Sequence, residues 1–164
     1  MKVLVLSDTH IPERAKDLPK KLYQELEDAS LIIHAGDFTE WWVFERLQGF
    51  APLKAVKGNM DTLEVKEKLP EKDIFEFEGI RIGLIHGYGS PTETHRMVKE
   101  AFQDEDLKLI VYGHTHQPRV EKVGDVTWLN PGSPTDFVFA PFFSFAYLEV
   151  EGGTVQRVEL IRID

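Results

Sequence analysis

Seven Asp, His and Asn side chains in this sequence are of the types that hold divalent metal ions. They lie in five separate segments and are Asp8, His10, Asp37, Asn59, His86, His114 and His116. Each segment also carries a glycine or a short polar turn, and glycine lets the backbone approach a bound group closely. Imidazole, carboxylate and amide ligands suit Mn²⁺, Fe²⁺, Ni²⁺ or Zn²⁺ better than Ca²⁺. The chain has no cysteine, which excludes disulfides, thiolate metal sites and cysteine nucleophiles.

Short aliphatic runs precede these residues and predict the strands that position them. Lys2 to Ser7 is nearly all aliphatic, as is typical of a strand buried on both faces, and Leu31 to Ala35 and Leu53 to Val56 are similar. Two helices are predicted between these strands, one through Leu18, Leu22 and Leu26 with Asp17 as its cap, and one through Val43, Phe44 and Leu47 behind Thr39. The alternation of strands and helices over residues 1–60 therefore predicts a doubly wound α/β unit.

The rest of the chain predicts hairpins and a further helix. Ile74 to Phe77 and Ile80 to Ile85 form two strands joined at Glu78-Gly79, and Ser90 to Glu93 has the Ser, Pro and Glu of a capping box. Leu107 to Tyr112 is aliphatic, and the short runs that follow it predict antiparallel strands. The pattern favours a mixed sheet or two packed sheets. Without a repeat or a linker, one domain over residues 1–164 is expected.

The predicted strand ends can bring the candidate ligands together. In open α/β sheets the carboxyl ends of the strands form the crevice where ligands bind. A single Asp after a strand is more often a turn residue, but five segments that end in Asp, Asn or His favour metal ligation. His34 lies within an aliphatic run and is expected to be a core histidine satisfied by a hydrogen bond. His95 lies in the helix after Ser90, where an exposed position is expected.

The order of these blocks resembles the calcineurin-like metallophosphoesterases. Their pattern of D-x-H, G-D, G-N, H and G-H-x-H matches Asp8-Thr9-His10, Gly36-Asp37, Gly58-Asn59, His86 and Gly113-His114-Thr115-His116. The chain is similar to the small YfcE-like phosphodiesterase branch, which often has an N-P-G-S loop like Asn130-Pro131-Gly132-Ser133. The resemblance implies an α/β fold in which mixed β-sheets pack as a sandwich flanked by helices, in four layers αββα.

The resemblance also implies a role for each candidate ligand. Asp8, His10, Asp37 and His116 would hold one metal, and Asp37, Asn59, His86 and His114 the other. Asp37 would bridge two ions roughly 3.5–4 Å apart, and a bridging hydroxide would attack the phosphorus in line. Asp37, Asn59 and His114 are the residues expected to act in catalysis. The branch implies Mn²⁺, with Ni²⁺, Fe²⁺, Zn²⁺ and Mg²⁺ as alternatives.

Charge favours a small phosphodiester as the substrate. Two dications minus the charges of Asp8 and Asp37 leave two positive charges, which a hydroxide and a diester monoanion would neutralise. A monoester dianion would overshoot by one, but Arg14 is a candidate phosphate contact that could reverse the balance, so a monoesterase remains the alternative. A solvated surface position is the simpler interpretation of Arg14. The net charge of -9 and the pI near 5.2 disfavour nucleic acid as a partner.

Three further residues bear on the reaction. Larger relatives have a histidine after the G-N pair where this chain has Met60, so an acid for the leaving group is missing. Close relatives often have H-G-H where this chain has Tyr88, which is a candidate donor to phosphate but a poor acid with a phenol pKa near 10. Asp61 is a candidate to orient a ligand histidine, because metal-bound imidazoles usually need an acceptor on the other nitrogen. A plain turn role is the alternative for Asp61.

The main rival function is protein binding. The superfamily that the chain resembles includes a retromer subunit that uses this fold as a docking scaffold with a degraded metal site, whereas all seven expected ligands are present here. Core packing is expected for most aromatic residues from Phe137 to Tyr147, with a contact between copies of the chain as the alternative. The apolar stretch from Phe137 to Leu148 is too short for a membrane span and the N-terminal run too short for a signal peptide, so a cytoplasmic location without a membrane is expected.

Overall fold

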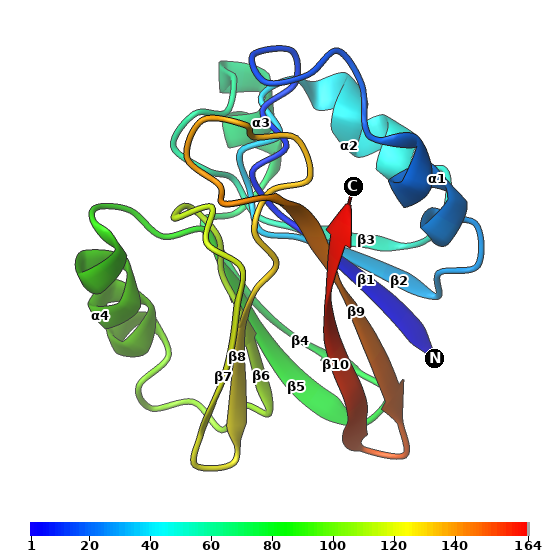
Figure 1. Ribbon diagram of the computed structural model, residues 1–164. Helices are drawn as coiled ribbons and strands as arrows, with labels where there is room; N and C mark the ends of the chain where they lie inside the picture. Colours follow the sequence, from blue (N-terminus) through cyan, green and yellow to red (C-terminus); the bar gives the residue numbers. More distant parts are fainter. Residues whose placement is uncertain (164) are drawn as a thin grey trace.

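A computed structural model describes residues 1–163, which form ten strands and four helices arranged around two sheets (Figure 1). The first half of the chain contains β1 (Lys2–Leu6), α1 (Lys20–Leu26), β2 (Leu31–His34), α2 (Trp41–Gln48), β3 (Leu53–Ala55), α3 (Leu63–Lys68) and β4 (Lys72–Phe77). The second half contains β5 (Ile80–Ile85), α4 (Pro91–Ala101), β6 (Leu109–Val111), β7 (Arg119–Val123), β8 (Val126–Asn130), β9 (Phe143–Glu151) and β10 (Thr154–Ile163). No helix within residues 1–163 is long and apolar enough to cross a membrane.

Both sheets are mixed, and each has three parallel strands. The first sheet has the order β10-β9-β1-β2-β3, in which β1, β2 and β3 are parallel and β9 and β10 are antiparallel to their neighbours. The second has the order β4-β5-β6-β8-β7, in which β5, β6 and β8 are parallel. Parallel strands end at the same edge of their sheet. The loops after β1, β2 and β3 therefore meet at one edge, and the loops after β5 and β6 meet at another.

Alternation along the strands divides the core into three layers of side chains and confirms the αββα arrangement. Val3 and Val5 of β1 pack between the sheets with Leu109 and Val111 of β6. The intervening residues of β1 point to the opposite face, because successive side chains in a strand alternate. There they pack with residues of α1 and α2 in a second cluster that includes Leu4, Leu6, Leu22, Leu26, Val43 and Leu47. A third cluster, which includes Ile85, Val98, Phe102, Ile110 and Trp128, lies between α4 and the second sheet.

Two local predictions are confirmed in detail. The β4–β5 hairpin turns at Glu78 and Gly79, whose φ angles of 49° and 82° are those of the turn that matches strand twist. The capping box is also present, because the Glu93 amide donates to Ser90 Oγ at 3.3 Å and the Ser90 amide donates to Glu93 Oε2 at 3.4 Å. Pro91 occupies the first turn of α4, where a missing N–H costs nothing.

The structure corrects the predicted start of the first helix and adds a helix that was not predicted. Asp17 does not cap α1, which begins at Lys20 after Pro19. Leu18 is buried, as expected, but it lies outside the helix because a residue before proline is disfavoured in the helical region. The helix α3 was not predicted, because it has six residues, of which only Val65 is buried, and shows no periodic apolar face.

One expectation about burial was wrong, and a second was met only in part. His95 is half-buried rather than solvated, because its ring stacks on Trp128 with 4.6 Å between the centroids. The aromatic segment is divided, since Phe143 and Tyr147 pack against the core cluster that contains Phe145. Phe145 is fully buried, but Phe137 and Phe139 are 69% and 65% exposed, and the others are half-buried. Strand β9 lies between β1 and β10 and buries Ser144, Phe145 and Ala146 in succession, whereas the loop before it leaves Phe137 and Phe139 exposed.

Candidate metal centre

The candidate ligands follow five strands and converge at the carboxyl edges of both sheets. Asp8 and His10 follow β1, Asp37 follows β2, Asn59 follows β3, His86 follows β5, and His114 and His116 follow β6. Six of them form two groups in which one ligand atom from each residue lies within 4.8 Å of the others. The first group is Asp8, His10 and His116, and the second is Asp37, His86 and His114. The division agrees with the one that the family resemblance implies.

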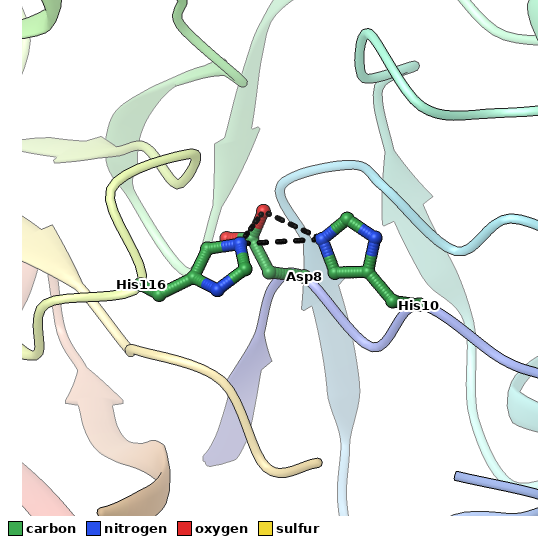
Figure 2. A group of neighbouring side chains, drawn as sticks. All are labelled: Asp8, His10 and His116. Atoms are coloured by element: carbon green, nitrogen blue, oxygen red, sulfur yellow. Dashed lines mark hydrogen bonds and ion pairs between the residues drawn. The ribbon is translucent and has the colours of Figure 1, made fainter. Parts of the chain in front are cut away.

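The first group surrounds one carboxylate oxygen. Figure 2 shows Asp8 between the rings of His10 and His116. The Oδ1 atom of Asp8 lies 3.6 Å from His10 Nε2 and 3.3 Å from His116 Nε2, and the two Nε2 atoms are 3.2 Å apart. The other carboxylate oxygen accepts hydrogen bonds from Ser7 Oγ at 2.7 Å and from the His114 amide at 3.0 Å. Oδ1 is buried and has no hydrogen-bond partner in residues 1–163.

The second group shares an oxygen with the first. Asp37 Oδ2 lies 3.1 Å from His86 Nε2 and 3.5 Å from His10 Nε2, so this atom faces both groups. Asn59 completes the second group with its Oδ1 atom, which is 3.0 Å from His86 Nε2. The Met60 amide donates to Asp37 Oδ1 at 2.8 Å and fixes the rotation of the carboxylate. Asp37 therefore lies where a bridging ligand would be needed.

Hydrogen bonds on the outer nitrogens orient three of the rings. His86 Nδ1 donates to the carbonyl oxygen of Ala35 at 2.7 Å, and His114 Nε2 donates to that of Gly89 at 3.0 Å. His116 Nδ1 donates to the buried carboxylate of Asp136. Since each donating nitrogen keeps its proton, the remaining nitrogen of each ring is the one that can act as a metal ligand.

Asp136 was missed by the sequence analysis. Besides His116 it accepts hydrogen bonds from the amides of Val138, Phe139 and Ala140 at 2.9 to 3.1 Å, and from Arg14 Nε at 2.9 Å. The only sequence signal is its position just after the N-P-G-S loop. Ser133 of that loop donates to the carbonyl oxygen of Asp8 at 2.7 Å and so ties this segment to the first group.

Asp61 positions backbone rather than an imidazole. Its carboxylate accepts hydrogen bonds from the amides of Gly58 at 2.7 Å, Asp37 at 3.1 Å and Thr39 at 2.9 Å. Burial raises the pKa of Asp61. This carboxylate therefore joins the loop after β2 to the loop after β3 and sets the distance between Asp37 and Asn59.

The backbone of the site is held in a conformation that L residues rarely adopt. Five of the seven candidate ligands have positive φ angles: Asp8 55°, His10 42°, Asp37 62°, His114 71° and His116 60°. Each such residue costs on the order of 1–2 kcal/mol. Amide hydrogen bonds between neighbouring loops hold this geometry, from Asp8 to the Gly36 carbonyl and from His10 to the Asp37 carbonyl, both at 2.9 Å. Strain of this kind is typical of functional sites.

Charge pairing within the site shifts the histidine pKa values strongly. Burial alone would lower the pKa of His86, but the charge of Asp8 and the hydrogen bond to Asp37 raise it to about 9. Burial also opposes protonation of His116, yet the adjacent carboxylates of Asp8 and Asp136 raise its pKa to about 9. Each proton occupies a position that a cation could take, because both neutralise the same carboxylates.

His34 has the predicted core role. Burial lowers its pKa to about 3, so the ring is neutral at pH 7. Its Nδ1 accepts from the Gly36 amide at 3.0 Å, and its Nε2 lies 3.2 Å from Thr9 Oγ1. The ring also stacks on Phe38 with 3.6 Å between the centroids. His34 thus supports the loops after β1 and β2 without facing the centre.

A cleft of about 540 Å³ opens onto the two groups. Arg14, Met60 and Phe139 line it together with ligand candidates from both groups. Arg14 is half-buried and forms an ion pair with Asp136, so it is not the solvated surface residue that was the simpler interpretation. Tyr88 is exposed and lines an adjacent pocket with Asn59 and His86 rather than the cleft itself.

Comparison with known proteins agrees with this geometry. The calcineurin-like phosphoesterase superfamily domain matches residues 1–153, and the chain belongs to that superfamily. A probable metallophosphoesterase of Methanothermobacter thermautotrophicus is 38% identical over 135 residues, which cover 82% of this chain and 78% of the relative. A phosphodiesterase of Methanocaldococcus jannaschii is 30% identical over 147 residues, covering 80% and 83%. The structure of Entamoeba histolytica Vps29 in complex with Zn²⁺ has a TM-score of 0.77 and 25% identity, covering 100% and 99%.

Proposed function

We propose that this chain hydrolyses phosphate esters with two divalent cations and prefers phosphodiesters. The observation that carries the proposal is the buried Oδ1 atom of Asp8, which lacks a hydrogen-bond partner in residues 1–163 and faces the Nε2 atoms of two histidines. A buried polar atom without a partner costs free energy, and a cation among these atoms would remove that cost. The donor set of carboxylates, imidazoles and one amide suits Mn²⁺, which we propose as the metal, with Ni²⁺, Fe²⁺ and Zn²⁺ as alternatives.

The protein's contribution is to hold the ligands and their protonation states. When bound, two divalent cations supply Lewis-acid activation of water and of the phosphoryl group. We assign the bridging position to Asp37, because its Oδ2 atom faces His10 and His86, one from each group. The bonds to the carbonyl oxygens of Ala35 and Gly89 keep the second group in the tautomers that ligation requires.

The charges around the cleft favour a diester over a monoester. Two carboxylates offset half of the charge of two dications and leave two positive charges for water-derived hydroxide and the substrate. Among the described residues that line the cleft, Arg14 is the one Lys or Arg. Its ion pair with Asp136 at 2.9 Å offsets its charge. The excess positive charge that a monoester dianion would need is therefore lacking.

Metal-dependent turnover tests the proposal. Model phosphate esters should be hydrolysed with added Mn²⁺, and turnover should stop with a chelator and in the Asp8→Asn variant, which weakens the first group. Asp125→Asn, at the exposed turn between β7 and β8, makes the same chemical change away from the site and should retain full activity. The proposal fails if the folded wild type hydrolyses no ester with Mn²⁺, Ni²⁺, Fe²⁺, Zn²⁺ or Mg²⁺.

Protein docking is the second candidate function. It is favoured by the exposed loop of Phe137, Val138 and Phe139, which Asp136 holds beside His116. Exposed apolar patches often mark interaction surfaces. A wild-type chain without turnover that binds a defined protein, with binding lost in the Phe137→Ser/Phe139→Ser variant, would favour docking over hydrolysis.

A further inference from the structure

A second groove, of about 480 Å³, lies beside α4 and is rich in positive charge. Its lining is Pro91, Thr92, His95, Arg96, Lys99 and Arg119, with no acidic residue among the described lining residues. Thr92, His95, Arg96 and Lys99 are three or four residues apart and are therefore neighbours on one face of the helix. Arg119 begins β7, the edge strand of the second sheet, which lies beside α4 (Figure 1). A cluster of this sign is unusual in a chain with a net charge of -9.

The groove has a fixed wall and two free cations. Arg119 Nη2 lies 2.9 Å from Glu121 Oε2, and the same oxygen lies 3.5 Å from His95 Nε2. Stacking on Trp128 fixes the ring of His95. Arg96 and Lys99 are exposed, and their side chains have no ion pair or hydrogen bond within residues 1–163. Three cations against the carboxylate of Glu121 leave two positive charges uncompensated.

The groove continues from the metal-centre cleft. Pro91 lines both the cleft and the groove, and α4 runs away from the cleft behind it. With a rise of 1.5 Å per helical residue, Arg96 lies about 8 Å and Lys99 about 12 Å along the helix from Pro91. These lengths fit an anionic group on the same small molecule whose scissile phosphate occupies the cleft.

We propose that this groove binds a second phosphate group of the substrate. Arginine and lysine bind phosphate oxygens through charge-assisted hydrogen bonds, and both of the uncompensated cations here are free to do so. The substrate class is then a small phosphodiester that carries a further phosphate or diphosphate beyond the bond that is cleaved. The inference rests on the proposed function for the scissile phosphate, but binding of an anion in the groove needs neither metal nor turnover.

Titration of the metal-free protein with inorganic pyrophosphate tests the groove directly. In the presence of a chelator, the NMR amide signals of residues 92–99 and 119 should shift, and Arg96→Gln/Lys99→Gln should weaken binding about tenfold. Lys20→Gln/Lys21→Gln removes the same charge from exposed positions of α1 and should leave the affinity unchanged. Equal affinity in the groove variant and the wild type, or shifts confined to the cleft, would overturn the proposal.

Kinetics with Mn²⁺ then test whether the groove serves the substrate. For a diester that carries a second phosphate, Arg96→Gln/Lys99→Gln should raise KM about tenfold and leave kcat unchanged. KM for a diester with a single phosphate should not change. An equal effect on both diesters would contradict the assignment. Absence of any turnover would instead contradict the proposed function, and the pyrophosphate titration would still decide whether the groove binds anions.

Discussion

Gly58→Ala should displace the bridging carboxylate of Asp37 together with the backbone that carries it. A Cβ atom at Gly58 would lie 2.1 Å from Asp37 Oδ1 and 2.6 Å from the Asp37 amide nitrogen. Ordinary contacts begin near 3.4 Å, so the carboxylate must move by about 1.3 Å, the difference of the two distances. Metal sites tolerate ligand displacements of about 0.2 Å. We therefore expect Mn²⁺ affinity to fall by at least about 10–100-fold at both sites, the usual effect of disturbing the support of a metal ligand.

Isothermal titration with Mn²⁺ measures this effect. Gly49→Ala is the matched control, since its φ, like that of Gly58, lies outside the left-handed region and its Cβ would come no closer than 3.3 Å to the Arg46 carbonyl oxygen. Circular dichroism of the metal-free proteins should show that both variants are folded. The reasoning would be refuted if Gly58→Ala bound two Mn²⁺ ions with the affinity of the wild type.

Three further predictions concern substrate, leaving group and pH. With Mn²⁺, bis(p-nitrophenyl) phosphate should be cleaved faster than p-nitrophenyl phosphate, because the charge of Arg14 is offset by Asp136; a clearly faster monoester would contradict this. Met60 lines the cleft but cannot donate a proton, so Met60→His should accelerate alkyl esters by up to roughly 10²–10⁴-fold and aryl esters little. The assay is log kcat/KM against leaving-group pKa, and a flat wild-type plot with rate-limiting chemistry would show that another acid is present. Because His86 and His116 have pKa values of about 9 without metal, Mn²⁺ must displace their protons, and its apparent affinity should rise from pH 6 to pH 8. The same protons stabilise the metal-free fold below pH 6.5, and this stabilisation should be lost as the pH rises through about 9. A Mn²⁺ affinity that does not change with pH, or a melting temperature of the metal-free protein that does not change with pH, would contradict the raised pKa values.

Much of the fold could be predicted because its determinants are local. The aliphatic runs before Asp8 and Asp37 are buried strands, and the turn at Glu78-Gly79 and the capping box at Ser90 each depend on a few neighbouring residues. The convergence of the ligand candidates within each sheet followed from strand order, since parallel strands end at one edge, whereas the packing of the two sheets brings the two edges together. Their division into two groups came from the family resemblance, because spacing alone does not show which loops face each other.

The residues that orient the site could not be predicted because their partners are distant in sequence. Asp136 contacts Arg14, which is 122 residues away, and no local pattern reveals that pair. The sequence around Asp61 is that of an ordinary turn, yet its carboxylate accepts hydrogen bonds from backbone amides of two separate loops. The exposure of Phe137 and Phe139 was equally hidden, since an apolar composition does not distinguish a rim from a core.

The bridging position of Asp37 is the central claim, and a metal titration of three proteins tests it most directly. The wild type should bind two Mn²⁺ ions per chain. His116→Ala should weaken only the first group, whereas Asp37→Ala should weaken both sites together and abolish turnover, because Asp37 Oδ2 faces both groups. If Asp37→Ala still bound two ions with near-normal affinity and turnover, the assignment of Asp37 as the shared ligand would be wrong.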